Sequence, residues 1–365
     1  MKRFLLIFLL CVLTAGLAFA QVDLQPVAIV RLTRSEPITV RQLKTELEKL
    51  AWQNLAPQLG RNPTNAEIAR EVERYGVNER RQVLEVEINN RLALQAAERD
   101  RVTVTDNELN QQITQLRTQM AQAIGRQPTD EEFAMAVKNE TGMELPAFRE
   151  NTRRQLLTQK YLMTKKQDVL SSVREPTERE ILDFYNLNKS GFVRPDTVRL
   201  SMIQVPFGSD AASKNRAKEL ADNLNRDIAS NPSRFDEAVL RGQAPNAGYQ
   251  AGDAGYLPRN NQAVQAAGQD FINTAFSLRQ GEVSRVIEGI GAYQIIKITE
   301  TLPFKALDID EIVEPGSRVT VREYIRQGLL QQRQQEVLTR ATEELVRELR
   351  AGNPFQIMEN NLTNW

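Results

Sequence analysis

The stretch AFSLRQGEVSRVIEGIGAYQIIKI, residues 275–298, decides the fold of the middle of the chain. It starts at the end of a short helical segment, passes through a turn, and ends on Tyr293–Ile298, whose composition predicts a strand. An earlier strand is predicted over Val198–Val205, and two helical segments follow it. Residues 242–255, rich in Gly, Ala, Asn and Gln, predict a loop. We therefore expect an inserted α+β domain over residues 195–302.

The chain before this domain is dominated by helix signals. A threonine followed three residues later by glutamate or glutamine recurs along it, which is the capping-box pattern of a helix start. The pairs are Thr39/Gln42, Thr64/Glu67, Thr105/Glu108, Thr129/Glu132 and Thr177/Glu180. We interpret this recurrence as repeated capping chemistry and not as a sequence repeat. The pattern predicts a helical region over residues 21–190.

After the α+β domain the chain returns to helix. Leu338, Ala341, Leu345 and Leu349 lie at helical spacing, and Pro354 follows where the helix is expected to end. Their apolar face needs a partner, and the inserted domain has core elements of its own. We therefore expect residues 303–365 to pack on the N-terminal region. The fold class is predicted as mostly α, with an inserted α+β domain.

Residues 1–20 have the pattern of a secretory signal peptide. Lys2 and Arg3 precede an uninterrupted apolar run over Phe4–Leu13, and Ala18 and Ala20 supply the small residues of a cleavage site. We predict cleavage after Ala20. Two alternatives are a retained membrane anchor and a lipid attached to a cysteine within the run.

Composition excludes most catalytic chemistry. The chain has no histidine, and its single cysteine, Cys11, lies inside the predicted signal peptide. Ser-His-Asp and Cys-His sites and cysteine or histidine metal sites are thus excluded from the mature chain. Cleavage removes two of 47 basic residues and none of 47 acidic residues, which gives no support to nucleic-acid binding. No nucleotide-binding Gly-x-x-x-x-Gly-Lys motif is present, and we expect no cofactor and no metal.

The middle block resembles the parvulin, or rotamase, domain of peptidyl-prolyl isomerases. The resemblance is carried by the order and spacing of five segments, namely Val198–Val205, Phe235–Leu240, Gly252–Tyr256, Ala275–Ser284 and Ala292–Lys297. The flanking residues resemble SurA- and PrsA-type extracytoplasmic chaperones, notably at Arg101–Leu109. This resemblance implies a helical SurA-like N-terminal domain, completed by the C-terminal helix, and one parvulin-like domain.

The resemblance also places the isomerase site. Parvulins commonly carry two histidines on adjacent strands, and the matching positions here hold Met202 and Gln294. The family's Cys or Asp partner falls near Ala244 or Pro245, and the apolar cradle for the prolyl ring includes two further residues. The expected cradle is Met202, Leu257, Phe271 and Gln294, and no residue is assigned a catalytic role.

These observations favour an ATP-independent periplasmic chaperone. Its expected partners are unfolded secreted or outer-membrane polypeptides, including β-barrel precursors, without nucleotide or nucleic acid. The parvulin-like domain is expected to have lost most isomerase activity, because neither thioether nor amide carries protons. One alternative is an active parvulin-type isomerase that assists exported proteins. The other is a scaffold subunit that binds one fixed partner.

Overall fold

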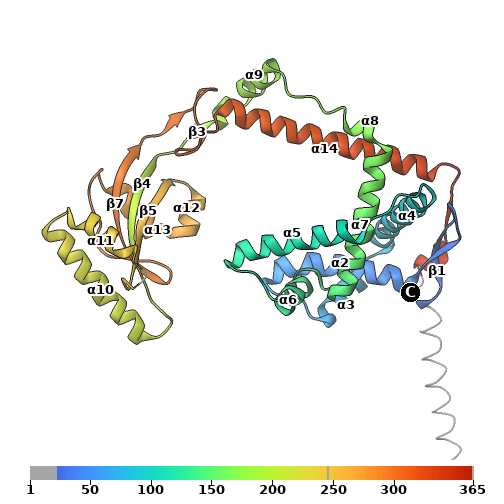
Figure 1. Cartoon of the computed structure of the whole chain (residues 1–365), viewed down its shortest axis with the longest axis horizontal. Coiled ribbons are helices and arrows are strands. Elements are labelled where there is room, and N and C mark those ends of the chain that lie inside the picture. The colour runs from blue at the N-terminus through green and yellow to red at the C-terminus, as the bar shows by residue number, and fades with distance from the viewer. Residues whose placement is uncertain (1–22, 245, 364–365) are drawn as a thin grey trace, which may run out of the picture. The chain divides into compact units, whose positions relative to one another are not determined.

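The computed structural model describes residues 23–244 and 246–363. The chain divides into two compact units (Figure 1). Unit 1 comprises residues up to 173 together with those from 333 onward, and unit 2 comprises residues 174–332. The predicted signal peptide and its cleavage site after Ala20 lie outside the described residues. Among the residues described, no helix is both long enough and apolar enough to cross a membrane.

Unit 1 is a helical bundle with a small sheet of strand order β2-β1-β9. Its elements before unit 2 are β1 (Pro26–Val30), β2 (Glu36–Thr39), α2 (Val40–Leu59), α3 (Asn65–Arg74), α4 (Val77–Arg99), α5 (Asp106–Ile124), α6 (Asp130–Thr141), α7 (Leu145–Lys165) and α8 (Gln167–Leu170). The end of α14 (Val321–Arg350), β9 (Phe355–Ile357) and α15 (Glu359–Thr363) complete it.

The C-terminal elements are part of the core of unit 1. Leu345 and Leu349 of α14 and Leu362 of α15 are buried in one cluster with residues of β1, α2 and α4. Ala341 is fully buried as well, whereas Leu338 is 42% exposed. The N-terminal helical region therefore needs the last helices to close its core, as the apolar spacing predicts.

Unit 2 is built on a four-stranded antiparallel sheet of order β5-β4-β7-β6. Its elements are α9 (Glu178–Leu187), β3 (Val193–Arg194), β4 (Thr197–Pro206), α10 (Ala211–Ser230), α11 (Arg234–Gly242), β5 (Gln250–Pro258), α12 (Asn261–Ala267), α13 (Gln269–Ser277), β6 (Ile287–Glu288), β7 (Ala292–Leu302), β8 (Lys305–Ala306) and the start of α14. One apolar cluster joins the sheet to α10 and α11, and another joins it to α12 and α13.

Two boundaries differ from the sequence interpretation. The segment expected as a loop over residues 242–255 contains most of β5, because pairing with β4 holds this glycine-rich stretch extended. The predicted division near residue 190 also shifts. Ile181 and Tyr185 of α9 pack with Leu307 and with Val321 at the start of α14, which forms a separate small core within unit 2.

The helices of unit 1 contain a repeat that the sequence interpretation missed. The motif Gly-Arg-x-Pro-Thr-x-x-Glu occurs at residues 60–67 and again at residues 125–132. Both glycines end a helix in the left-handed conformation, at φ 62° and 73°, and both threonines cap the next helix in a capping box. In each copy the arginine forms a bidentate ion pair with the glutamate.

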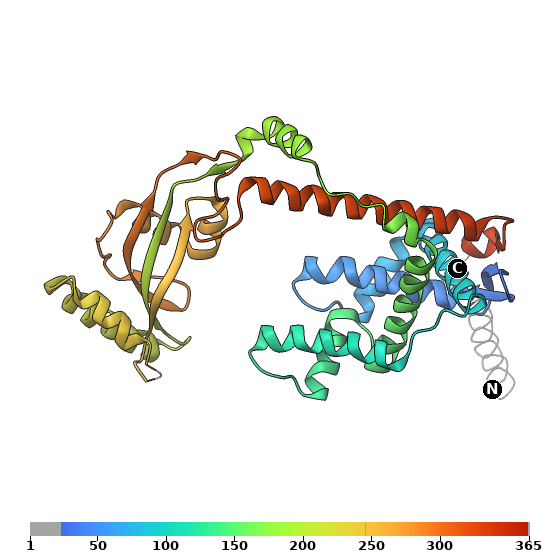
Figure 2. The same ribbon diagram turned by 45° about the horizontal axis from the view of Figure 1, so that its top comes forward.

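The repeat extends beyond this turn. Thr39 and Thr105 cap α2 and α5, and Arg80–Leu84 in α4 matches Arg153–Leu157 in α7 as Arg-Arg-Gln-x-Leu. Figures 1 and 2 show α2 and α5 running in the same direction, with α3 and α6 at the same end. We call residues 36–99 the first helical copy and residues 102–165 the second helical copy. The prediction that no sequence repeat exists is wrong.

Candidate functional site

The residues predicted for the isomerase cradle lie along one face of the unit 2 sheet. Met202 of β4 lies opposite Ile296 of β7 and Gly252 of β5. Leu257 lies opposite Val198, four residues from Met202 on the same face. Met202 and Leu257 are partly buried and pack in one cluster with Phe271 of α13. The structure therefore brings three of the four predicted residues together.

Gln294 lies at the other end of this face, outside the apolar cluster. It pairs with Gln204 on β4 and with Ile287 on β6. A Cβ atom built at Gly289 would lie 2.9 Å from Oε1 of Gln294, so a side chain at position 289 would displace the amide. The nearby Ser284 hydroxyl accepts the amide N–H of Ile296 at 2.9 Å and is buried. Met202, Gln294 and Ser284 do not change charge between pH 5 and 8.

The position of the family's Cys or Asp partner holds no titratable group in the described part of the chain. Ala244 is exposed and closes a turn by donating its N–H to the carbonyl of Arg241 at 3.1 Å. Pro245 lies outside the described residues. Phe271 is 7% exposed, so this ring is largely a core residue of unit 2. Met202, Leu257, Phe271 and Gln294 thus offer apolar contact and one amide, and none of these four side chains carries a proton between pH 5 and 8.

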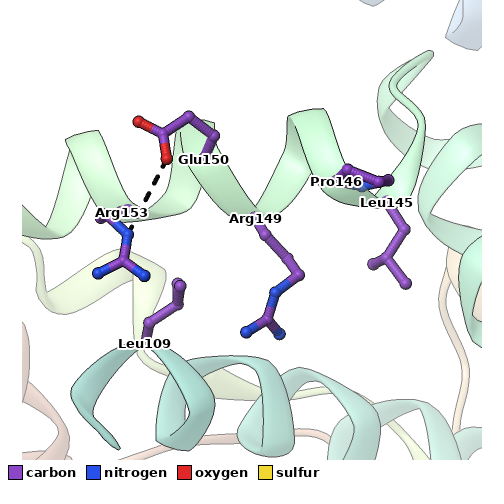
Figure 3. Close-up of a pocket in the computed structure, with 6 residues that line it drawn as sticks. All are labelled: Leu109, Leu145, Pro146, Arg149, Glu150 and Arg153. Carbon is purple, nitrogen blue, oxygen red and sulfur yellow. Dashed lines mark ion pairs between the residues drawn. The ribbon is translucent and has the colours of Figure 1, made fainter. Parts of the chain in front are cut away.

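Unit 1 holds a cleft of about 340 Å³ between α5 and α7 (Figure 3). Its apolar wall is Leu109 of α5 with Leu145 and Pro146 at the start of α7. Three charged residues of α7 complete the lining, namely Arg149, Glu150 and Arg153. The guanidinium of Arg149 donates to Oδ1 of Asn110 at 2.7 Å, which holds this cation along the cleft. The cleft combines apolar and cationic surface.

A second cleft, of about 430 Å³, shares Arg153 with the first. It is lined by Glu98, Arg101–Val104, Arg153 and Leu157. Arg153 donates to the carbonyl of Val104 at 3.2 Å and to Asp106 at 2.6 Å, and Lys160 donates to the carbonyl of Thr103 at 2.9 Å. These contacts hold residues 102–105, which belong to no helix or strand, beside α7.

The carboxylate of Glu108, in the capping box that follows residues 102–105, is strongly stabilised in its charged form. The Nζ of Lys160 lies 2.5 Å from Glu108, and the Glu108 carboxylate also accepts the N–H of Thr105 at 2.8 Å. The Lys160 hydrogen bond first, and then the Thr105 hydrogen bond, lower the pKa of Glu108 to about 2. Residues 102–105 are therefore anchored at their C-terminal end by a charge that persists to low pH.

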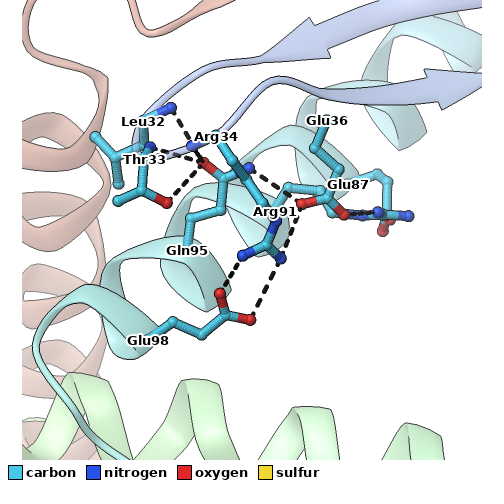
Figure 4. Close-up of polar contacts among 8 residues, drawn as sticks. All are labelled: Leu32, Thr33, Arg34, Glu36, Glu87, Arg91, Gln95 and Glu98. Atoms are coloured by element: carbon cyan, nitrogen blue, oxygen red, sulfur yellow. Dashed lines mark hydrogen bonds and ion pairs between the residues drawn. The ribbon is translucent and has the colours of Figure 1, made fainter.

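In the first helical copy, a buried amide holds the turn that precedes the corresponding segment Glu36–Thr39 (Figure 4). Oε1 of Gln95, a fully buried residue, accepts the N–H groups of Leu32 and Thr33 at 3.1 and 3.0 Å. The Gln95 amide nitrogen donates to Glu36 at 3.1 Å, and Glu36 also pairs with Arg91. This network fixes the turn between β1 and β2. The residues of this turn line neither of the two clefts.

The linings of the two clefts also hold the carboxylates of Glu98 and Glu150 and the hydroxyl of Thr103. Their linings combine short apolar side chains with arginines, which suits binding of a chain segment by contact and hydrogen bonding. Sequence reasoning did not find these clefts. The available signal was the second Gly-Arg-x-Pro-Thr motif, since it marks a second helical copy, beside which no strand of residues 23–244 or 246–363 takes the place of β1.

Comparison with known proteins assigns both parts of the chain. Residues 3–162 match the SurA-like N-terminal domain, and residues 176–314 match the PPIC-type PPIase domain, Rotamase_2. Foldase protein PrsA of Clostridium botulinum strain Hall is 23% identical over 270 residues, which cover 73% of this chain and 70% of that protein. PrsA of Clostridium kluyveri is 26% identical over 234 residues, 63% of each chain.

Solved structures of such proteins are also similar. One comes from work on PEB4 and the periplasmic protein Cj1289, two SurA-like chaperones of Campylobacter jejuni. It is 14% identical, covers 92% of this chain and 99% of that chain, and has a TM-score of 0.34. PrsA from Bacillus subtilis is 18% identical over 89% of this chain and 92% of its own, with a TM-score of 0.25. The chain thus joins a SurA-like N-terminal domain, closed by its C-terminal helix, to one PPIC-type rotamase domain, and it is a relative of the PrsA foldases.

Proposed function

We propose that this SurA/PrsA-like foldase chaperone binds unfolded exported polypeptides without ATP, through the two adjoining clefts of unit 1. The observation that carries the proposal is their lining, which combines leucine, valine and proline side chains with Arg101, Arg149 and Arg153 and with the carboxylates of Glu98 and Glu150. Such a surface can hold many sequences weakly, because apolar contact and hydrogen bonds to backbone carbonyls do not depend on one side chain. Release then follows from competition by folding of the bound chain.

The rotamase domain is proposed to keep peptide contact and little catalysis. Rotation about a prolyl amide crosses a barrier of ~18–20 kcal/mol, so a catalyst must bind the twisted amide more tightly than the planar one. Met202, Leu257 and Phe271 can contact a prolyl ring, whereas Gln294 supplies only an uncharged amide near that face. The alternative, an active isomerase, is supported by the same apolar cluster.

An aggregation-suppression assay tests the chaperone function. The mature chain, beginning at residue 21, is added to a chemically unfolded, exported β-barrel protein on dilution, and light scattering is recorded. Val104→Asp places a charge in the second cleft and should weaken suppression several-fold. Val86→Asp is the matched control, because Val86 is exposed on α4 and lines neither cleft. Equal loss in both variants, or no suppression by the wild type, would refute the proposal.

Two further measurements separate the alternatives. A panel of unrelated unfolded proteins distinguishes a general chaperone from a scaffold subunit, which would bind one of them. A proline-isomerisation assay on the mature chain measures catalysis, and we expect a low rate that is flat between pH 5 and 8 because the sheet face has no titrating group in that range. A high rate with a sigmoidal pH profile would favour the active-isomerase alternative.

The proposed site of action is the periplasm. The basic start, apolar run and Ala18–Ala20 pattern support export. The intact mass of the exported chain should correspond to a mature N-terminus at Gln21. A lipid-bearing chain that retains Cys11 would contradict this.

A further inference from the structure

Each helical copy of unit 1 begins with a four-residue segment that ends on the threonine cap of its first long helix. Glu36–Thr39 is β2, and its last residue caps α2; Val102–Thr105 ends in the same way on the cap of α5. The positions correspond one to one, so that Pro37 matches Thr103 and Ile38 matches Val104. The threonine caps, the next turn and the third helix are shared as well. The two segments therefore hold the same place in the two copies.

The copies differ in what lies beside these segments. β1 pairs antiparallel with β2, with Ala28 opposite Ile38, and packs in one cluster with Leu84 of α4. In the second helical copy, no strand of the described residues pairs with residues 102–105. The second cleft lies there instead, and it is lined by Val104 and by Leu157, the residue that matches Leu84. The cleft thus occupies the position that β1 fills in the first copy.

The hydrogen bonds of β1 show which residues of β2 direct their backbone groups toward β1. The matching residues of the second copy would pair with an added strand. The carbonyl of Val27 accepts from Met358, and the N–H of Arg31 donates to Pro354, so these residues of β1 face the β9 side. Ala28 and Val30 alternate with them and therefore face β2. Ile38 is then the hydrogen-bonding partner of Ala28, and Pro37, which has no N–H, faces away from β1.

By this correspondence Val104 has its backbone groups toward the second cleft. Its carbonyl accepts from Arg153, which lines that cleft, and its N–H donates no hydrogen bond to any described residue. The N–H of Thr103, by the same correspondence, faces away. The N–H of Val104 and the second lone pair of its carbonyl oxygen are thus presented to an incoming strand, beside a wall lined by Leu157, Arg101 and Glu98.

We propose that an extended apolar segment of an unfolded polypeptide binds in the second cleft by adding as a β-strand to Val102–Thr105, as β1 adds to β2. This inference rests on the proposed chaperone function and specifies its binding mode. The occupant follows from the first copy, where the segment in this place is Pro-Val-Ala-Ile-Val, residues 26–30. Strand addition supplies affinity through the main chain, so one site accepts many apolar sequences.

Backbone N-methylation of a peptide tests the hydrogen bonds without altering the protein. The probe is a fluorescein-labelled peptide with the sequence of residues 25–31, Gln-Pro-Val-Ala-Ile-Val-Arg. Methylation of its alanine nitrogen should raise the Kd for the mature chain at least tenfold. Methylation of the isoleucine nitrogen, which faces away, should change the Kd less than twofold. Equal effects of the two methyl groups would overturn the proposal.

The protein offers a matched pair for the reverse test. Val104→Pro deletes the pairing donor and should weaken peptide binding at least tenfold. Val86→Asp, on the exposed side of α4 and outside both clefts, should leave the Kd within twofold. Amide hydrogen exchange of the wild type gives a readout that needs no variant to fold, since the peptide should protect the N–H of Val104 more than that of Thr103.

The outcomes separate this inference from the proposed function. Suppressed aggregation and peptide binding without protection at Val104 would leave the chaperone function standing and remove the strand addition. Protection of Val104 in the free chain would show that another segment of the chain, or a second copy, fills the cleft, and would also overturn the inference. Absence of aggregation suppression would instead refute the proposed function.

Discussion

The first and second helical copies share their turns and caps but not their surroundings. The first is covered by β1, β9 and the C-terminal helices, and its Leu43 and Leu84 are fully buried together with Leu362 of α15. The second forms a small core of its own around Ile113 and Phe133 and keeps two open clefts along α7. The same local sequence thus produces a closed core in one place and an accessible surface in the other.

This difference shows that the local sequence determines where the helices form. The elements that pack over the helices determine whether their apolar faces become a buried core or an accessible cleft. A helix hairpin with good caps forms from short-range contacts, whether or not a strand lies across it. The strand position is filled in the first copy by a segment of the same chain. In the second copy the chain provides the matching edge without a partner strand in the described residues.

The largest expected contrast between the copies is in stability. Leu362→Ala removes a fully buried side chain from the core of the first copy and should lower the free energy of unfolding by about 2–5 kcal/mol. Val104→Ala, in the second copy, should change it by less than about 1 kcal/mol because Val104 lines an open cleft. Urea unfolding of both variants measures the two values. Similar losses would mean that the second cleft is as structural as the first core.

A smaller effect is expected from the buried amide of the first copy. Gln95→Ala leaves the N–H groups of Leu32 and Thr33 without their acceptor and should cost about 1–3 kcal/mol of unfolding free energy. The variant should also speed amide exchange at Leu32 and Thr33 and leave exchange at Val104 unchanged. Faster exchange at Val104 would show that the two copies are coupled.

Much of this architecture could be predicted from the sequence. The capping threonines mark true helix starts because their contacts are local, and the apolar spacing of α14 identified a helix that packs on the N-terminal region. β5 escaped because its glycines lack strand propensity, and pairing with β4 alone determines its conformation. The clefts could not be predicted for a related reason. A cleft forms where no other element packs over two helices, and the sequence of those helices does not show which elements pack over them.

The isomerase face shows the same limit. The resemblance to parvulins grouped Met202, Leu257 and Phe271, and the strand register and the packing of α13 bring the three residues into one cluster. The environment of Gln294 depends on the close approach of Gly289 to its side-chain amide. No sequence pattern around residue 289 predicts this contact. The contribution of these four residues to peptide binding stays a prediction.

The smallest expected effect is one in which the copies should behave alike. Glu67 and Glu132 each accept hydrogen bonds first from the arginine of their motif and then from the capping threonine, which lowers the pKa of both carboxyls to about 2. Since the ordinary pKa is near 4.5, both groups stabilise the fold fully above pH 4.5 and lose that contribution as the pH falls toward 2.

Glu67→Gln and Glu132→Gln keep a capping side chain that does not titrate, as Gln42 does at the cap of α2. Each variant should therefore be less stable than the wild type at pH 6, and the difference should shrink between pH 4.5 and 2. Because both carboxylates are exposed, 1 M NaCl should reduce the difference at pH 6 as well. Urea unfolding across this pH range measures both curves, and a difference for one copy that does not vary with pH would mean that its Arg–Glu pair is not formed in solution.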